Sequence, residues 1–302
     1  MTAIQAPQEE NATNNTPECS KPVLQVMICT YGADGIARVA ESMHPATPGV
    51  EYLVSWQTDG NTPLPHSLER SDFKVFTTSS KGLSANRNHA LGKATAPLLL
   101  ISDDDVEYTK DNLLTIIKAF EGNPNADILT FKYDTKNCHK TYPERSISLA
   151  TPPKGYFVSS IEIAFRRDSI QGNIWFNENF GIGAVFPSGE EEIFIKDCLA
   201  KGLTGRFIPQ SIARHDGDTT TQRTAMLPVL PQTKGAVFLL THPADWMPRM
   251  AVHSIREARL WINGKGLSPF EYIRNWLIGA TKAKRLKVFP TPDYSKKYLS
   301  HG

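Results

Sequence analysis

The strongest constraint on the fold is the alternation of short apolar segments with amphipathic segments along the first half of the chain. Apolar stretches of strand length occupy residues 23–31, 51–57, 72–78, 97–101 and 126–133. Residues with helical spacing lie at 36–43, 83–94 and 113–120. Strands that alternate with helices are joined by right-handed crossovers and form a mostly parallel sheet. The pattern therefore predicts an α/β fold in which helices flank the sheet.

The pattern becomes less regular after residue 135. The sequence predicts a strand at 161–167, a glycine- and aromatic-rich loop at 176–189, a helix at 190–202, a short strand at 205–209 and helices at 250–262 and 269–287. Residues 1–20 are polar and lack periodicity, which predicts a disordered arm. We therefore expect a main domain over residues 21–232, with halves at 21–135 and 136–232, and a C-terminal helical appendage over 233–302.

Composition narrows the class of protein. Hydrophobic residues make up 40% of the 302 residues and charged residues 21%, so the chain can bury a substantial core. The net charge of +2 gives no reason to expect nucleic acid as a partner. The cysteines are scattered and form no C-x-x-C pair, which fits a reducing compartment better than a disulfide or zinc framework. With no signal peptide and no apolar span in the sequence, we expect a cytoplasmic protein.

Three consecutive aspartates follow the apolar run at 97–101, which is typical of a buried strand of a parallel sheet. The carboxyl ends of such strands are where open α/β sheets bind ligands. Side chains alternate along the chain, so Asp103 and Asp105 share one face while Asp104 points elsewhere. Crowded carboxylates repel one another unless a cation neutralises them, and oxygen ligands suit Mg²⁺ or Mn²⁺. The alternative is a polar loop that ends the strand and caps the next helix.

Four segments in order resemble those of family 2 glycosyltransferases, which have the GT-A fold. They are a strand ending in Thr30 and Tyr31, GLSANRNHAL (82–91), ISDDDV (101–106) and FGIGAVFPSGEEEIFIKDCLAKG (180–202). The last is similar to the form found in bacterial capsule and lipopolysaccharide enzymes of the family. The resemblance covers roughly residues 22–220 and implies a nucleotide-sugar-binding half at 21–135 and an acceptor-binding half at 136–232.

The resemblance implies a reaction that moves a sugar, with inversion, from a nucleotide-diphosphate sugar to a hydroxyl group. A UDP-sugar is the expected donor, and a saccharide or lipid-linked saccharide of surface polysaccharide synthesis the expected acceptor. Mn²⁺ or Mg²⁺ would stabilise the leaving diphosphate. By the family pattern Asp105 is the metal ligand, and Asp103 lies near the ribose or contacts the metal less directly. We expect Asp103 and Asp104 to contribute to donor binding, although side-chain alternation places Asp104 on the opposite face of the chain from Asp103.

The acceptor hydroxyl must lose its proton to a base. In the family the base follows a glycine and a glutamate, which corresponds to Glu191, with Glu190 as the alternative. Three glutamates also simply suit the first turn of a helix, whose dipole is positive there. That reading is expected for Glu192, because successive helical residues point about 100° apart and cannot all face one cleft.

The same motifs predict further residues of the donor site. Thr30 and Tyr31 end the first strand beside the donor. Arg87 would pair with a donor phosphate or brace the aspartates, and Asn88 follows it; the alternative for both is a solvated helix face. His215, after the strand at 205–209, is expected near the metal or diphosphate, or else is structural.

Gln57 departs from the family, which usually has an aspartate at this strand end. Its amide can donate and accept, so it could still read a uracil edge. The departure weakens the assignment of a UDP-sugar.

Two other classes of function remain open: a metal-dependent nucleotidyltransferase or phosphohydrolase, and a non-catalytic nucleotide-sugar-binding protein. The stretch 272–287 mixes apolar residues (Tyr272, Trp276, Leu277, Ile278) with basic ones. Such a helix can lie on an anionic membrane surface, which predicts peripheral contact with the inner face of the cell membrane. The alternative is a helix packed on the catalytic domain.

Overall fold

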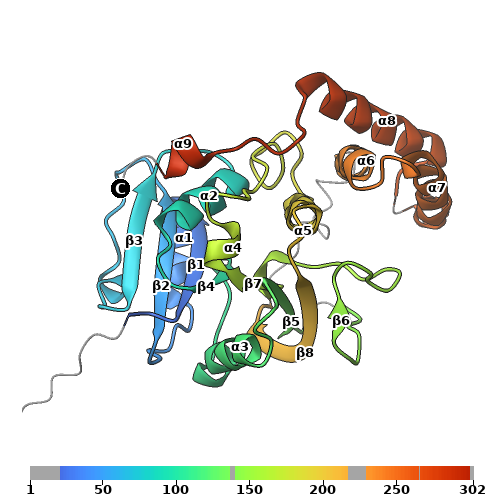
Figure 1. Cartoon of the computed structure of the whole chain (residues 1–302). Helices are drawn as coiled ribbons and strands as arrows, with labels where there is room; N and C mark the ends of the chain where they lie inside the picture. Colours follow the sequence, from blue (N-terminus) through green and yellow to red (C-terminus); the bar gives the residue numbers. More distant parts are fainter. Residues whose placement is uncertain (1–20, 137–139, 217–228, 265, 300–302) are drawn as a thin grey trace, which may run out of the picture.

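A computed structural model describes residues 21–136, 140–216, 229–264 and 266–299. The predicted disordered arm at 1–20 lies outside the described residues. Within them one eight-stranded sheet has the order β3-β2-β1-β4-β7-β5-β8-β6 (Figure 1). In chain order the strands are β1 (Leu24–Tyr31), β2 (Val50–Gln57), β3 (Phe73–Thr78), β4 (Leu98–Ser102), β5 (Ile128–Asp134), β6 (Ile147–Ser148), β7 (Ile163–Arg166) and β8 (Gly205–Arg214).

The first four strands are parallel, as the alternation of strands and helices predicts. They are connected through α1 (Gly32–Glu41) and α2 (Leu83–Lys93), and α3 (Lys110–Glu121) follows β4. Alternate residues of β1 enter two cores: Leu24 and Val26 on one face, Met27 and Cys29 on the other. Burial on both faces explains why these strands read as continuous apolar runs.

The second half departs from the predicted elements in two places. The strand predicted at 161–167 is divided into a 3-10 turn (Ser160–Glu162), β7 and the short helix α4 (Arg167–Ile170). β7 lies between β4 and β5 and is antiparallel to both. β8 extends well past its predicted end, since it pairs with β5 across register shifts that accommodate Pro209.

The helix predicted at 190–202 forms as α5 (Glu190–Ala200), and the predicted C-terminal helices form as α7 (Trp246–Ile262) and α8 (Pro269–Leu286). Sequence reasoning missed α6 (Leu230–Thr241) and α9 (Ser295–Tyr298). Pro231 and Gly235 obscure α6 in the sequence, but proline is tolerated in the first turn of a helix. Gly235 lets α6 pack directly on the backbone of α8, because a Cβ there would overlap the Trp276 carbonyl. α6 begins at Leu230, so the predicted domain division at 232 falls within this helix. The division itself stays a prediction.

Two of the four apolar residues expected to face a membrane from α8 point inward instead. Tyr272 and Trp276 are buried, and Trp276 stacks on Phe238 of α6 with ring centroids 5.1 Å apart. These two aromatic residues therefore hold the helical appendage together. Leu277 and Ile278 are exposed, and membrane contact by α8 stays a prediction. Within the described residues no helix is both long and apolar enough to cross a bilayer.

Candidate active site

The aspartates lie where the parallel strands β1, β2 and β4 end at one edge of the sheet. Asp104 has different partners from Asp103 and Asp105, as expected, but no contact joins Asp103 to Asp105, and the convergence of these two stays a prediction. Asp104 accepts a hydrogen bond from Thr30 Oγ1 (2.7 Å) and two from Arg38 of α1, from Nε (3.0 Å) and Nη2 (2.9 Å). Both Asp104 oxygens are thus engaged in joining β4 to β1 and α1, and the donor-binding role of Asp104 and Thr30 stays a prediction.

Arg87 of α2 is the centre of the site and is fully buried. Its Nη1 lies 3.1 Å from Glu190 Oε1 and 3.6 Å from Glu191 Oε1, and its Nη2 lies 3.4 Å from Asp103 Oδ1. The guanidinium also lies over the Phe176 ring, 5.6 Å from the centroid. Burial lowers the pKa of Arg87, but the surrounding carboxylates outweigh it and raise that pKa overall. One cation therefore connects the aspartate segment to the glutamate segment.

The three glutamates that begin α5 have different environments. Glu190 is buried with its side chain 5% exposed, and burial followed by the charge of Glu191 raises its pKa to about 8. The Glu191 side chain is 20% exposed. Glu192 accepts a hydrogen bond from Thr241 of α6 (3.3 Å), as expected for a residue that serves the helix start. Of the two glutamates beside Arg87, Glu191 is therefore the one that is accessible to solvent.

Asp105 and His215 meet across the sheet edge. His215 Nε2 lies 3.2 Å from Asp105 Oδ1, and the Asp105 side chain is 41% exposed. Burial raises the pKa of Asp105, but the hydrogen bond and charge of His215 lower it overall. The hydrogen bond to Asp105 likewise raises the pKa of His215. A backbone bridge between Glu107 and Arg214 brings the two together, with hydrogen bonds of 2.9 and 3.0 Å.

Asn88 is fully buried and forms hydrogen bonds to the segment at 176–178. Its Nδ2 donates to the Phe176 carbonyl (2.9 Å) and to Glu178 Oε1 (3.2 Å), and its Oδ1 accepts from the Phe176 amide (2.8 Å). This arrangement supports the shape of the site, and donor contact by Asn88 stays a prediction.

Gln57 also has local partners. Its Nε2 donates to the carbonyls of Ser80 (2.9 Å) and Gly82 (3.1 Å), so the amide oxygen is the group left to contact a ligand. Tyr31, next to Gln57 in the β1–β2 register, is exposed.

Two residues that sequence reasoning passed over join the site. Ser160 Oγ donates to Asp103 Oδ2 (3.3 Å). Asn86 donates to the Thr30 carbonyl (3.0 Å) and accepts from Ser55 Oγ (2.5 Å), which ties α2 to β1 and β2. Asn86 stands inside the motif at 82–91 and could have been found there. Ser160 could not, because only the fold brings it to Asp103.

The loop at 177–189 packs on the start of α2. The Ile182 carbonyl accepts from the Leu83 amide (2.9 Å), and the Phe180 carbonyl accepts from Ser84 Oγ (2.7 Å). Gly181, with φ of 99°, lies against Glu190, and a Cβ at Gly181 would come within 3.3 Å of Glu190 Cδ. A larger residue would push the loop off the buried glutamate.

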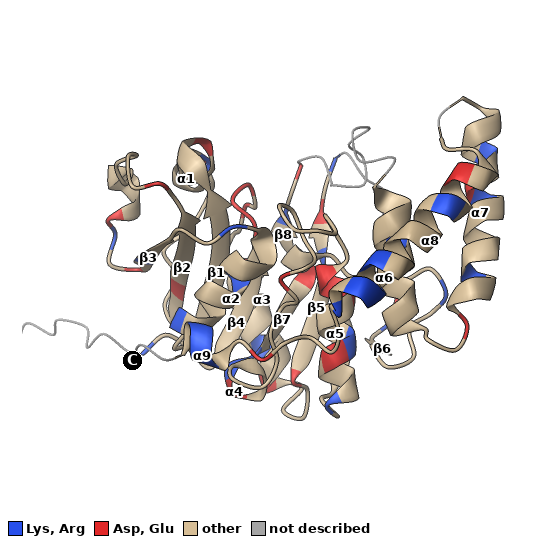
Figure 2. Cartoon of the chain, turned by 90° about the horizontal axis from the view of Figure 1, so that it is seen from above, with Lys and Arg blue, Asp and Glu red and all other residues tan. Residues whose placement is uncertain are grey.

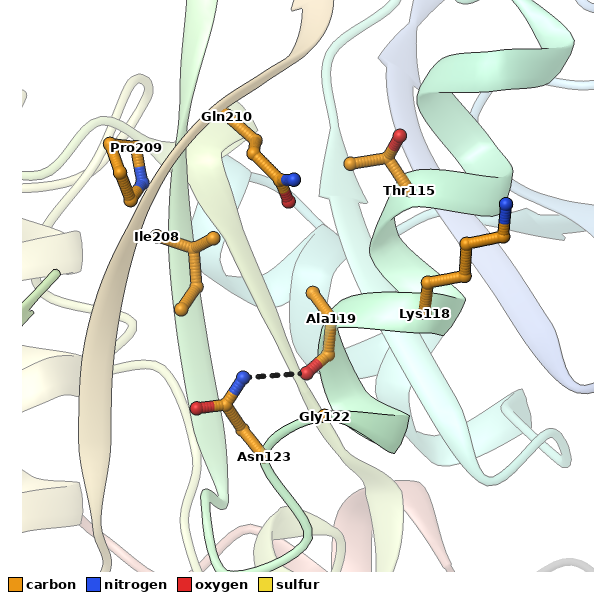
Figure 3. A pocket seen from close by; sticks show the side chains of 8 residues that line it. All are labelled: Thr115, Lys118, Ala119, Gly122, Asn123, Ile208, Pro209 and Gln210. Atoms are coloured by element: carbon orange, nitrogen blue, oxygen red, sulfur yellow. Dashed lines mark hydrogen bonds between the residues drawn. The ribbon is translucent and has the colours of Figure 1, made fainter.

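Two surface pockets lie away from the aspartates, Arg87 and the glutamates. One of about 360 Å³ lies between α3 and β8 (Figure 3) and is lined by Thr115, Lys118, Ala119, Gly122, Asn123, Ile208, Pro209 and Gln210. Another of about 570 Å³ lies at the amino ends of β5 and β8, opposite the aspartate edge. Over the part of the chain that the structure describes, no three His, Cys, Asp or Glu side chains group closely enough to hold a metal by themselves.

The mostly parallel sheet, with carboxylates at its strand ends bridged by a buried arginine to an acidic helix start, has the GT-A fold. Residues 63–183 match the model "Glycosyl transferase family 2". The matched segment includes Arg87 and the three aspartates and ends before the glutamates.

Solved structures support the same fold. The structure of S. aureus TarS 1-349 is similar with a TM-score of 0.53 and 15% identity, over 87% of this chain and 91% of that chain. TarS 1-349 in complex with UDP-GlcNAc gives a TM-score of 0.51 and 15% identity, over 87% and 92% of the two chains. The mannosyltransferase PcManGT from Pyrobaculum calidifontis, in complex with GDP-Man and Mn²⁺, gives 0.52 and 14% identity, over 90% and 89%. At these identities the likeness establishes the fold. No curated protein matches the sequence.

Proposed function

We propose that this glycosyltransferase moves a sugar, with inversion, from a nucleotide-diphosphate sugar to a hydroxyl group of a saccharide or lipid-linked saccharide in bacterial surface polysaccharide synthesis. The observation that carries the proposal is the contact of one buried Arg87 with Asp103 on the donor side and with Glu190 and Glu191 on the other. TarS bound to UDP-GlcNAc and PcManGT bound to GDP-Man have the same fold, which supports a nucleotide-sugar donor.

Glu191 is the proposed base. A general base needs access to the acceptor hydroxyl, and the Glu191 side chain is partly exposed beside Arg87. Glu190 is enclosed, its Oε1 is paired with Arg87, and its raised pKa keeps it largely protonated near neutral pH. We assign Glu190 the task of holding Arg87, which in turn orients Glu191.

Asp105 and His215 are the proposed metal ligands. Their facing Oδ1 and Nε2 atoms, with Asp105 partly open to solvent, form a donor set that suits Mn²⁺ or Mg²⁺. Two protein ligands fit an ion that takes its remaining ligands from water and substrate phosphates. When bound, the ion would stabilise the negative charge of the leaving diphosphate. PcManGT in complex with Mn²⁺ supports the use of a divalent ion in this fold.

A UDP-sugar is the proposed donor. The Gln57 amide hydrogens are used by backbone carbonyls, so its oxygen can accept a hydrogen bond from the N–H of a uracil edge. Tyr31, exposed at the neighbouring strand end, and Asp103 complete the donor side of the proposed site.

A nucleotide-sugar screen tests the function. UDP- and GDP-sugars are compared by thermal shift with and without Mn²⁺, and NMR then follows the anomeric configuration of the product. We expect a UDP-sugar to raise the melting temperature in the presence of Mn²⁺, because a ligand of the folded state stabilises it. Consumption of the nucleotide sugar without transfer would favour a phosphohydrolase, and binding without turnover would favour a binding protein.

Peripheral contact with an anionic membrane is proposed for the helical appendage, through α7 and the exposed Leu277 and Ile278 of α8. Val252, Ile255, Arg259 and Ile262 follow one face of α7 at helical spacing, and Ile255 and Ile262 are 69% and 74% exposed. Lys and Arg occur along α7 and α8 (Figure 2). Apolar side chains beside arginine suit the boundary between acyl chains and anionic headgroups.

Vesicle co-sedimentation tests this contact. We expect the protein to pellet with phosphatidylglycerol vesicles, less so at high salt, and Ile255→Asp with Ile262→Asp to abolish pelleting. Met43→Asp, at another exposed apolar residue, is the matched control. Equal pelleting of the α7 variant would contradict the proposal, as would a concentration-dependent dimer lost in that variant.

A further inference from the structure

The chain returns from the helical appendage to the catalytic sheet after α8. Residues 288–299, here called the C-terminal strap, run back to α2 and end in α9 (Figure 1). The strap passes along the loop at 177–189, here called the glycine loop, which leads directly into Glu190 and Glu191. The two segments lie about a hundred residues apart in the sequence.

The first part of the strap contacts the beginning of the glycine loop. Asn177 is fully buried, and its Nδ2 donates to the Val288 carbonyl (2.7 Å) and to Thr291 Oγ1 (3.2 Å). Thr291 Oγ1 in turn donates to Asp197 of α5 (2.6 Å). One strap residue thus joins the loop to the helix that carries the glutamates.

The second part of the strap converges on Glu178. Lys297 Nζ lies 2.7 Å from Glu178 Oε2, and the Tyr298 hydroxyl donates to Glu178 Oε1 (2.7 Å). The same Oε1 accepts from Asn88 of α2 (3.2 Å). Glu178 therefore couples the strap to the helical residue next to Arg87.

The surface on which α9 packs is formed by α2 and Trp175. Gly92 of α2 faces the Tyr298 backbone, and a Cβ at Gly92 would come within 2.6 Å of the Tyr298 carbonyl oxygen. Trp175 lies 5.7 Å from the Tyr298 ring and donates from Nε1 to Asp293 Oδ1 (3.2 Å). Close backbone approach at a glycine, together with aromatic packing, indicates a specific docking site for the strap.

We propose that Glu178 is a positioning residue, through which the C-terminal strap holds the glycine loop and the start of α5 in the geometry that catalysis requires. The kinetic part of this inference rests on the proposed function. The loop contains glycines with positive φ at 181, 183 and 189, and these residues have more conformational freedom than any other type, so the strap contacts add restraint to those that α2 makes with the loop. When the strap holds the loop in one conformation before substrate binds, the entropy cost of ordering the loop is not part of the catalytic barrier.

The double variant Lys297→Ala with Tyr298→Phe tests the inference, with Lys284→Ala on α8 as the matched control. We expect kcat to fall by about tenfold or more, because small displacements at the site are costly. The acceptor KM should rise and the donor Kd should stay unchanged, because the strap contacts the glutamate side. Glu178→Gln, which keeps a carbonyl acceptor for Tyr298 and Asn88, should recover more activity than Glu178→Ala.

Hydrogen exchange provides a readout that does not depend on the reaction. The double variant should exchange faster over residues 177–189, while β1 and β4 keep their protection. Unchanged exchange in the loop would overturn the inference, and so would faster exchange with an unchanged kcat. If the wild-type chain transfers no sugar, the proposed function fails, and the exchange data still decide whether the strap holds the loop.

Discussion

The aspartate side and the glutamate side of the site are built in different ways. Asp103 to Asp105 follow one buried strand, β4, and each is held by contacts near that strand end: Asp104 by Thr30 and Arg38, Asp103 by Arg87 and Asp105 by His215. Glu190 and Glu191 begin a helix whose approach is set by the glycine loop and a strap from the far end of the chain. Arg87 is the contact between the two sides. The donor side should therefore tolerate distant changes that disturb the glutamate side.

Replacing Arg87, which connects the two sides of the site, should have the largest effect on activity and stability. Arg87→Ala removes the fully buried cation that contacts Asp103, Glu190 and Glu191 and truncates a large buried side chain, and such core truncations typically cost about 2–5 kcal/mol. We expect activity to be lost and the free energy of unfolding, measured by urea denaturation, to fall by that order. Arg87→Lys keeps a charge without the planar fork and should retain more stability but little activity. Near wild-type stability of Arg87→Ala would show that the two sides are independent.

Asp105→Asn tests the donor side alone. Loss of the carboxylate should lower turnover by at least about a hundredfold, since a bound metal contributes several kcal/mol to the transition state. Calorimetry of UDP binding should show that the enhancement by Mn²⁺ is lost. Unchanged Mn²⁺-dependent binding in the variant would exclude Asp105 as the ligand.

Glu191→Gln tests the glutamate side alone. We expect donor binding to be preserved and kcat to fall by about a hundredfold, as on losing a positioned base. Glu190→Gln is the matched comparison. The opposite ranking of the two variants would move the base to Glu190, and two active variants would leave the triplet as a helix start.

The two sides should also differ in the pH dependence of stability. The pKa of Glu190 is raised to about 8, so the folded state binds more protons than the unfolded state between pH 4.5 and 8. The free energy of unfolding should therefore decrease as pH rises through this window, with a slope of at most about 1.4 kcal/mol per pH unit from this group. Urea denaturation of Glu190→Gln across the window should give a flatter profile; an equal slope in both proteins would contradict the assignment.

The smallest effect is expected at Arg38. Its pair with Asp104 is partly exposed, so Arg38→Ala should cost less than about 1 kcal/mol. Donor affinity should stay unchanged if Asp104 only braces the strand ends. A large loss of UDP affinity in this variant would instead restore Asp104 to the donor-binding residues.

The sequence alone determined the parallel strands and the helices between them, because each depends on a period of two or 3.6 residues within one segment. It also indicated Arg87 and the glutamates through short motifs. Tertiary structure decided which glutamate is enclosed, where His215 lies and that Tyr272 faces inward. It also decided that Ser160 and the C-terminal strap reach the site. These features depend on contacts between segments far apart in the chain, and local periodicity carries no information about such contacts.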